Sequence, residues 1–378
     1  MSRTSKYFLF LVVVILSTLL VKGAGVSVPT GTWAAFSNMA EPRDGASAAL
    51  LADGRVLITG GSGANGQSAS AEIFNGGGAF SPAASMNAAR SRHVSVALLD
   101  GRVLVAGGST GGGGVTNSAE IYDPASDSWT SVAGGMVEAR AGHTASLLAD
   151  GRVLIAGGDS VATISSSVEI FDPTIDSFSF AGILSSPRKD HAAAVLADGR
   201  VLIVGGSDGT NVLASSDIFD AASGTVSAGP ALSSPRAGHS ATTLLDGSVL
   251  VVGGSNGADD LATSEIADSA AAAFAPGANM SAPRSGHLAF RLPNNNSVLI
   301  VGGSSMGTAQ ASAELYIPWS GTFQPTGALS TARAGAAGST MQQHGLLLVA
   351  GGSGQASSEL YGFATVKTER TTMHPARS

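Results

Sequence analysis

The chain has 378 residues, of which 51 are Gly and only 12% are charged. Its formal net charge of −7 at pH 7 has the sign that repels a phosphate backbone, so we exclude nucleic acid as a partner. Cys is absent, which excludes disulfides and lipid attachment to Cys, and the many Gly residues favour tight turns between strands.

Residues 1–25 are expected to form a secretory signal peptide. Arg3 and Lys6 precede a hydrophobic run from Tyr7 to Val21, and the small residues 23–25 follow. The alternative is an uncleaved N-terminal anchor, although a run of about 15 residues is short of the ~20 that span a bilayer. Membrane contact is expected only in that case. We therefore predict an exported protein that is periplasmic, at the cell surface or secreted.

A pair of Gly residues recurs seven times at spacings of 47 to 50 residues. Each pair follows an apolar run such as VLIA (153–156), and in most units an Asp-Gly turn precedes that run. Asp-Gly between two apolar runs predicts a β-hairpin. The pairs begin at Gly60, Gly107, Gly157, Gly205, Gly253, Gly302 and Gly351.

Two further strands are predicted in every unit. The third carries an acidic residue before an apolar pair, at Glu72, Glu120, Glu169, Asp217, Glu265, Glu314 and Glu359. The fourth is marked by a large apolar residue, at Trp33, Phe80, Trp129, Phe178, Val226, Phe274 and Phe323. Four short strands per unit of about 48 residues predict one blade of a β-propeller.

The two ends of the repeat complement each other. Trp33 marks a fourth strand with no earlier part of a blade before it, whereas no large aromatic residue follows Glu359 at the expected distance. We predict an all-β fold, a seven-bladed β-propeller of four-stranded antiparallel blades over residues 26–362, in which an N-terminal strand closes the ring and removes the open edges. Residues 363–378 are expected to be a polar tail.

The units resemble kelch repeats, of the bacterial type similar to the propeller domain of galactose oxidase. The matching stretches include PRKDHAAAVLADGRVLIVGG (187–206) and SAEIYDPASDSW (118–129). The resemblance implies the propeller fold, but kelch propellers include oxidases, sugar mutarotases and protein-binding modules, so it does not imply one function.

Copper-radical chemistry of the galactose-oxidase kind is disfavoured. In that family, a Tyr joined to a Cys helps to hold the metal, and this chain has no Cys. Tyr122, Tyr316 and Tyr361 share one third-strand position, which indicates a structural role. A mutarotase-like carbohydrate enzyme stays open as the alternative function, since sugar-ring opening needs only a positioned acid and base.

An Arg stands before the first strand of every unit, and a His follows it by three residues in five of them. As ligand contacts, the arginines would form a ring at one mouth of the channel that binds carboxylates or anionic sugars. As structural groups, they would pair with the third-strand acids, and each His would bond to the neighbouring blade. The arginines are Arg43, Arg90, Arg140, Arg188, Arg236, Arg284 and Arg333, and the histidines are His93, His143, His191, His239 and His287.

Loop lengths between the strands are nearly uniform, with no room for an inserted lid, which favours a binding surface over a catalyst. We therefore expect a monomeric, non-catalytic module outside the cytoplasm. A glycan or protein ligand would bind at one mouth of the ring. We expect no metal site and no cofactor.

Overall fold

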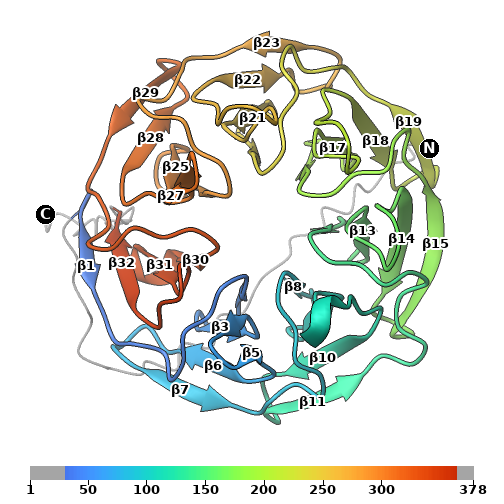
Figure 1. Cartoon of the computed structure of the whole chain (residues 1–378), viewed down its shortest axis with the longest axis vertical. Coiled ribbons are helices and arrows are strands. Elements are labelled where there is room, and N and C mark those ends of the chain that lie inside the picture. Colours follow the sequence, from blue (N-terminus) through green and yellow to red (C-terminus); the bar gives the residue numbers. More distant parts are fainter. Residues whose placement is uncertain (1–29, 364–378) are drawn as a thin grey trace, which may run out of the picture.

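A computed structural model describes residues 30–363. They form seven four-stranded antiparallel sheets arranged as a ring around a central axis, and the region along this axis is called the channel below (Figure 1). This confirms the predicted seven-bladed propeller. The expected leader lies outside the described residues. The described residues include Phe363, the first residue of the expected tail, whose side chain is buried and whose N–H donates to the Gly345 carbonyl.

Blades 1 to 7 are numbered from the N-terminus by their innermost strands, which surround the channel. These strands are β2 (Ser47–Leu50), β8 (Val94–Ala97), β12 (Thr144–Leu147), β16 (Ala192–Val195), β20 (Ser240–Thr243), β24 (Leu288–Arg291) and β30 (Ala337–Met341). The second strands are the predicted apolar runs: β3 (Val56–Thr59), β9 (Val103–Ala106), β13 (Val153–Ala156), β17 (Val201–Val204), β21 (Val249–Val252), β25 (Val298–Val301) and β31 (Leu346–Ala350).

The third strands carry the predicted acids and the outer strands carry the predicted large apolar residues. The third strands are β6 (Ala71–Phe74), β10 (Ala119–Asp123), β14 (Ser167–Asp172), β18 (Ser216–Asp220), β22 (Ser264–Ala267), β28 (Ala313–Ile317) and β32 (Ser358–Gly362). The outer strands of blades 1 to 6 are β7 (Phe80–Ala83), β11 (Ser128–Ser131), β15 (Ser177–Ile183), β19 (Thr225–Ala228), β23 (Phe274–Pro276) and β29 (Thr322–Pro325).

The remaining elements are short. Two small hairpins lie in loops, β4 (Ser62–Gly63) with β5 (Gly66–Gln67) and β26 (Ser304–Ser305) with β27 (Thr308–Ala309). Two 3-10 turns are η1 (Gly111–Gly113) and η2 (Gln342–His344). Within residues 30–363, no helix is long and apolar enough to cross a membrane.

The N-terminal strand closes the ring, as predicted. β1 (Trp33–Ala35) pairs antiparallel with β32 and supplies the outer strand of blade 7. Trp33 lies opposite Tyr361, with their ring centroids 5.1 Å apart. Blades 7 and 1 then bury a shared apolar cluster that includes Met39, Ile58 and Leu348.

The hydrophobic core lies between neighbouring blades. All residues of the second strands are buried, and their side chains alternate between the two adjacent interfaces, as Val103 and Leu104 do. Each fully buried aliphatic side chain contributes about 1.5–3 kcal/mol. The ring is therefore stabilised by seven similar interfaces rather than by one central core.

Candidate ligand-binding site

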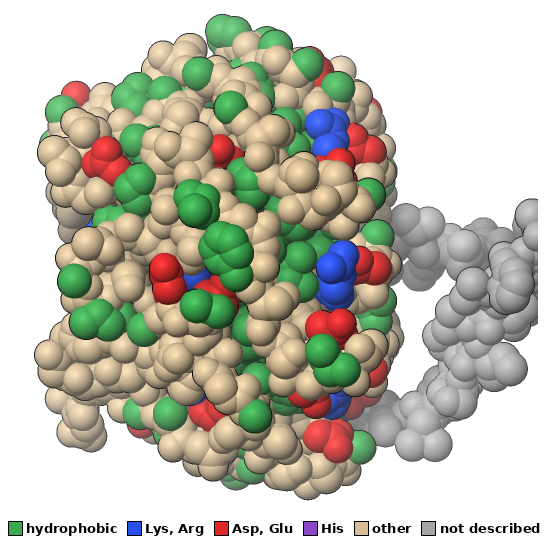
Figure 2. Space-filling view, turned by 90° about the vertical axis from the view of Figure 1, so that its right-hand side faces the viewer, with side chains coloured by type: hydrophobic (Ala, Val, Ile, Leu, Met, Phe, Trp, Pro, Cys, Tyr) green, Lys and Arg blue, Asp and Glu red, His purple; other side chains and the backbone are tan. Residues whose placement is uncertain are grey.

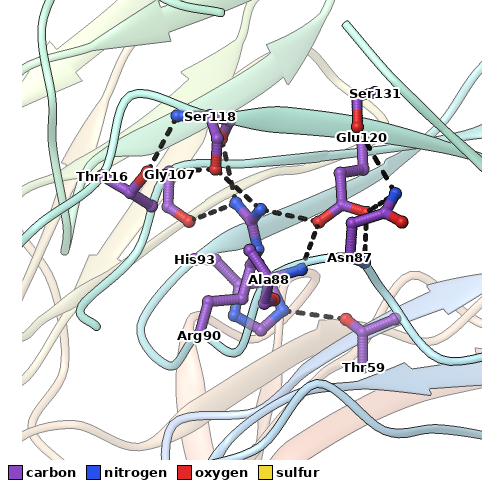
Figure 3. A network of polar contacts seen from close by, with 10 residues as sticks. All are labelled: Thr59, Asn87, Ala88, Arg90, His93, Gly107, Thr116, Ser118, Glu120 and Ser131. Atoms are coloured by element: carbon purple, nitrogen blue, oxygen red, sulfur yellow. Dashed lines mark hydrogen bonds and ion pairs between the residues drawn. The ribbon is translucent and has the colours of Figure 1, made fainter. Parts of the chain in front are cut away.

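The repeated arginines lie inside the blades. In blade 2, Arg90 Nη1 donates to the carbonyls of Gly107 and Ser118, at 2.8 and 2.9 Å, while Nη2 donates to Glu120 Oε1 at 2.9 Å (Figure 3). Glu120 also accepts the backbone N–H groups of Asn87 and Ala88. One Arg and one acid therefore link three segments by hydrogen bonds: the loop before the first strand, the Gly-Gly turn and the third strand.

All seven blades repeat this ion pair, with N···O distances from 2.5 to 3.6 Å. At each position, the Arg is at most 1% exposed. The geometry favours the structural interpretation, because none of these seven guanidinium groups reaches solvent to meet a ligand. The residues concerned are the predicted ligand contacts Arg43, Arg90, Arg140, Arg188, Arg236, Arg284 and Arg333.

The histidines lie at the interfaces between blades. Three of them bond to a hydroxyl of the preceding blade: His93 to Thr59 at 2.8 Å, His191 to Thr144 at 2.9 Å and His287 to Ser240 at 2.9 Å. Burial lowers the pKa of each of these three histidines to about 3, and nearby arginines add to the shift. They are therefore neutral structural groups at pH 7.

His143 and His239 have no hydroxyl partner, so the expected bond between blades forms in three of the five cases. In the blades that precede them, the position that corresponds to Thr144 and Ser240 is occupied by Val94 and Ala192, respectively. Burial also holds the pKa of both rings well below the ordinary value for His. These two side chains fill space in the interface between neighbouring blades.

The first Gly of each pair makes room for this packing. Gly107 has φ +66°, and a Cβ on it would lie 2.5 Å from the Arg140 carbonyl oxygen and 2.6 Å from the His143 ring of the next blade. No larger residue fits without moving the neighbouring backbone. The Gly-Gly signature is thus a requirement of blade packing.

The three tyrosines that could be compared with copper ligands are in the blade core. Burial raises the pKa of Tyr122, Tyr316 and Tyr361, which disfavours the phenolate form that binds a metal. Across residues 30–363, no group of three or more His, Asp or Glu side chains is placed to hold a metal ion.

At one end of the channel, the residues two positions after each Arg form a ring that we call the arginine mouth. Its members are Gly45, Arg92, Gly142, Asp190, Gly238, Gly286 and Gly335, and all have φ between +51° and +67°. Backbone hydrogen bonds of 2.7 to 3.2 Å join them from blade to blade in six of the seven steps.

Two members of the arginine mouth depart from Gly and contact each other. Arg92 Nη2 lies 3.0 Å from Asp190 Oδ1, and Arg92 Nη1 lies 3.2 Å from Asp159 Oδ2. Lys189 Nζ lies 2.7 Å from Asp159 Oδ1. Sequence reasoning missed this network, although alignment of the seven units shows Gly at this position in the other five.

The opposite end of the channel, formed by the hairpin turns between the first and second strands, is the turn mouth. Here an Asp and an Arg two residues later form an ion pair of 2.7 Å in blades 1 to 4, as Asp100 and Arg102 do. Arg102 also reaches Asp176 of blade 3 at 2.9 Å. In the edge-on view, basic and acidic side chains lie side by side along one rim (Figure 2).

A pocket of about 290 Å³ opens at the turn mouth. Its walls come from the ends of β2 and β8 and from η2, so it lies where blades 7, 1 and 2 meet. The lining includes Leu50, Leu51, Ala97, Leu98, Gln342 and Gln343. Sequence reasoning did not find this pocket, because Leu50, Leu51, Ala97 and Leu98 are ordinary members of the repeat and the departure at Gln342 and Gln343 was not recognised.

A second cavity, of about 10 Å³, lies between blades 6 and 7. Ala336 lines it at the position where five blades carry His, and Arg333 lines it as well. This volume is about that of one water probe. It is too small for any larger ligand.

Comparison with known proteins agrees with the propeller. No curated protein matches the chain. The solved structure described as that of YjhT is 17% identical, with a TM-score of 0.61, and the match covers 77% of this chain and 99% of that one. A fungal alcohol oxidase of the AA5 family, in complex with copper, is also 17% identical, with a TM-score of 0.72 and coverage of 88% and 76%.

These two similarities show the fold alone. The family is shown by a family model. The model of the KLHDC2/KLHL20/DRC7 Kelch-repeats domain matches residues 93–303, which is more than half of the sequence. The matched region contains the Arg, His and Gly-Gly positions of blades 3 to 6. The chain therefore belongs to the kelch-repeat family of this description.

Proposed function

We propose that the protein is a non-catalytic binding module that acts outside the cytoplasm and takes a glycan or protein ligand at a mouth of its channel. The observation that carries the proposal is the pocket of about 290 Å³ at the turn mouth. Its volume is near the lower end of the range, about 300–1,000 Å³, that holds small ligands in proteins.

The burial and pairing of the repeated Arg and His side chains support a binding role over a catalytic one. Each repeated Arg is paired with its third-strand acid, and the five histidines are buried and neutral. A general acid or base has to reach its substrate by a hydrogen bond. These buried groups serve the scaffold and offer no such contact.

The test is an array of glycans and peptides probed with the full chain. We expect at least one class to bind, with saturation at micromolar to millimolar concentrations. A protein shown by circular dichroism to be folded, but binding neither class, would contradict the proposal.

Export has its own test. We expect the mature protein in the periplasmic or extracellular fraction, with an N-terminus near residues 23–25. Retention of the full-length chain in the cytoplasm would contradict this part of the proposal while leaving the binding role intact.

A further inference from the structure

We propose that the turn-mouth pocket binds an uncharged peptide segment with an apolar side chain. This inference rests on the proposed binding function and specifies its ligand and its place. Three features favour this ligand: the aliphatic wall, the paired state of the nearby charges and the two carboxamides at the edge.

The wall of the pocket is aliphatic. Leu51 and Leu98 are buried, Leu50 and Ala97 are half-buried, and all four contribute to the lining. An apolar ligand side chain placed here would remove both its own surface and that of the wall from water, which stabilises the complex.

No charged side chain lines the pocket. The nearest acids in sequence, Asp53 and Asp100, are already engaged by their own turns. Asp53 accepts the backbone N–H of Arg55 at 3.0 Å and its Nε–H at 2.7 Å, and Asp100 binds Arg102 in the same way. A charged ligand would lose water here without gaining an unpaired opposite charge.

Two carboxamides provide the polar contacts. Gln342 and Gln343 lie on η2, both are exposed, and neither side chain has a hydrogen bond within the described part of the chain. A carboxamide offers two N–H donors and one carbonyl acceptor. It can therefore pair with both the C=O and the N–H of a peptide group.

A peptide fits this lining better than a sugar. A sugar ring carries hydroxyl groups on most of its carbons, and those facing Leu50, Leu51 and Leu98 would lose water without a hydrogen-bond partner. A peptide separates its polar backbone from an apolar side chain. That separation matches carboxamides on one side of the pocket and leucines on the other.

The experiment uses the full chain and a panel of N-acetylated, C-amidated tetrapeptides built from Ala, Ser, Gln, Leu and Phe. The same peptides extended by Asp or Lys, and a panel of neutral oligosaccharides, form the comparison arms. Binding is measured by ligand-observed NMR and the best peptide is titrated by calorimetry. We expect the uncharged peptides containing Leu or Phe to bind most tightly.

Two variants locate the site. Ala52→Trp places a large ring at the exposed edge of the pocket and should weaken binding about tenfold or more. Ala149→Trp is the matched control, since Ala149 occupies the same position of the same Leu-Ala-Asp-Gly turn in blade 3, is equally exposed and does not line the pocket. It should change the affinity by less than about twofold.

The double variant Gln342→Ala, Gln343→Ala should weaken the best peptide about tenfold, because up to two hydrogen bonds are lost. Both positions are exposed, so the fold is expected to persist.

The outcomes separate the two proposals. If no probe of any class binds, the proposed function itself fails. Three results would leave the binding function standing and overturn the pocket assignment: preference for charged peptides or oligosaccharides, equal effects of Ala52→Trp and Ala149→Trp, and peptide binding that requires deletion of residues 364–378, which would make this chain's own end the occupant.

Discussion

Arg92 and Asp190 form an ion pair that spans blade 3 at the arginine mouth, with Nη2 3.0 Å from Oδ1. Both residues have positive φ, +53° and +51°, where five sister positions carry Gly. Such a backbone costs a residue with a side chain about 1–2 kcal/mol, whereas an exposed ion pair contributes about 0–1 kcal/mol. We therefore expect the backbone strain at Arg92 to outweigh its ion pairs with Asp159 and Asp190.

Arg92→Gly should stabilise the fold. It removes one strained backbone position at the loss of two partly exposed ion pairs, with Asp159 and Asp190, so we expect the free energy of unfolding to rise by up to about 1 kcal/mol. Chemical denaturation measures this change. Arg92→Ala keeps the strain and removes the charge, and it should lower stability by less than about 1 kcal/mol. A less stable Arg92→Gly protein would show that the ion pair outweighs the strain.

Arg236→Ala should be strongly destabilising. It leaves the buried carboxylate of Glu265 without its ion-pair partner, and the carbonyls of Gly253 and Thr263 lose donors. Breaking a buried pair from one side costs about 3–5 kcal/mol. Thermal and denaturant unfolding check this value. Arg200→Ala, at an exposed turn, is the control and should cost under about 1 kcal/mol. Similar losses in both variants would argue against the structural role.

Stability should fall as the pH is lowered from 6.5. His93, His191 and His287 stay neutral in the folded protein until about pH 3, because burial lowers the pKa of each ring, whereas in the unfolded chain they bind a proton below about pH 6.5. The unfolded state then holds more protons, so each His removes about 1.4 kcal/mol per pH unit within that window.

Denaturant unfolding between pH 6.5 and 5 tests this slope above the range in which carboxylates titrate. His191→Asn should show a shallower slope than the parent protein, whatever its absolute stability. An unchanged slope would mean that His191 is not neutral in the fold.

Deletion of residues 26–42 should open the ring. It removes β1 and the buried side chain of Met39, so blade 7 loses its outer strand and the interface with blade 1 loses packing. We expect the free energy of unfolding to fall by more than about 5 kcal/mol, since Met→Ala costs about 2–5 kcal/mol and Trp→Ala about 3–5 kcal/mol at packed positions. Deletion of residues 364–378 is the control. Equal melting temperatures for the two proteins would refute closure by β1.

Most of the fold was predictable because each blade repeats the same local signals. The Gly-Gly spacing, the apolar second strands and the aromatic residues of the outer strands identified the strands, and the unmatched Trp33 identified the closing strand. The repeat period predicts the strands because every blade packs against its neighbours through the same set of residue types.

The candidate site was less predictable, because it depends on differences between blades. Burial of Arg140 and its sisters comes from the packing of strands and loops, which spacing does not reveal. The turn-mouth pocket depends on η2 replacing an Asp-Gly turn in blade 7, where Gln342 and Gln343 extend toward blade 1. The positions at which a blade departs from the repeat are therefore the ones that indicate a candidate site.

The pairing of β1 with β32 also sets how the ring responds to force. Trp33 pairs with Tyr361, Ala34 with Leu360 and Ala35 with Glu359, so the first residue of β1 lies beside the end of β32. A force that separates the segment before β1 from the segment after β32 would break these pairs one after another, instead of shearing all of them at once. The strand that holds the ring closed at equilibrium is therefore also the one through which tension would open it first.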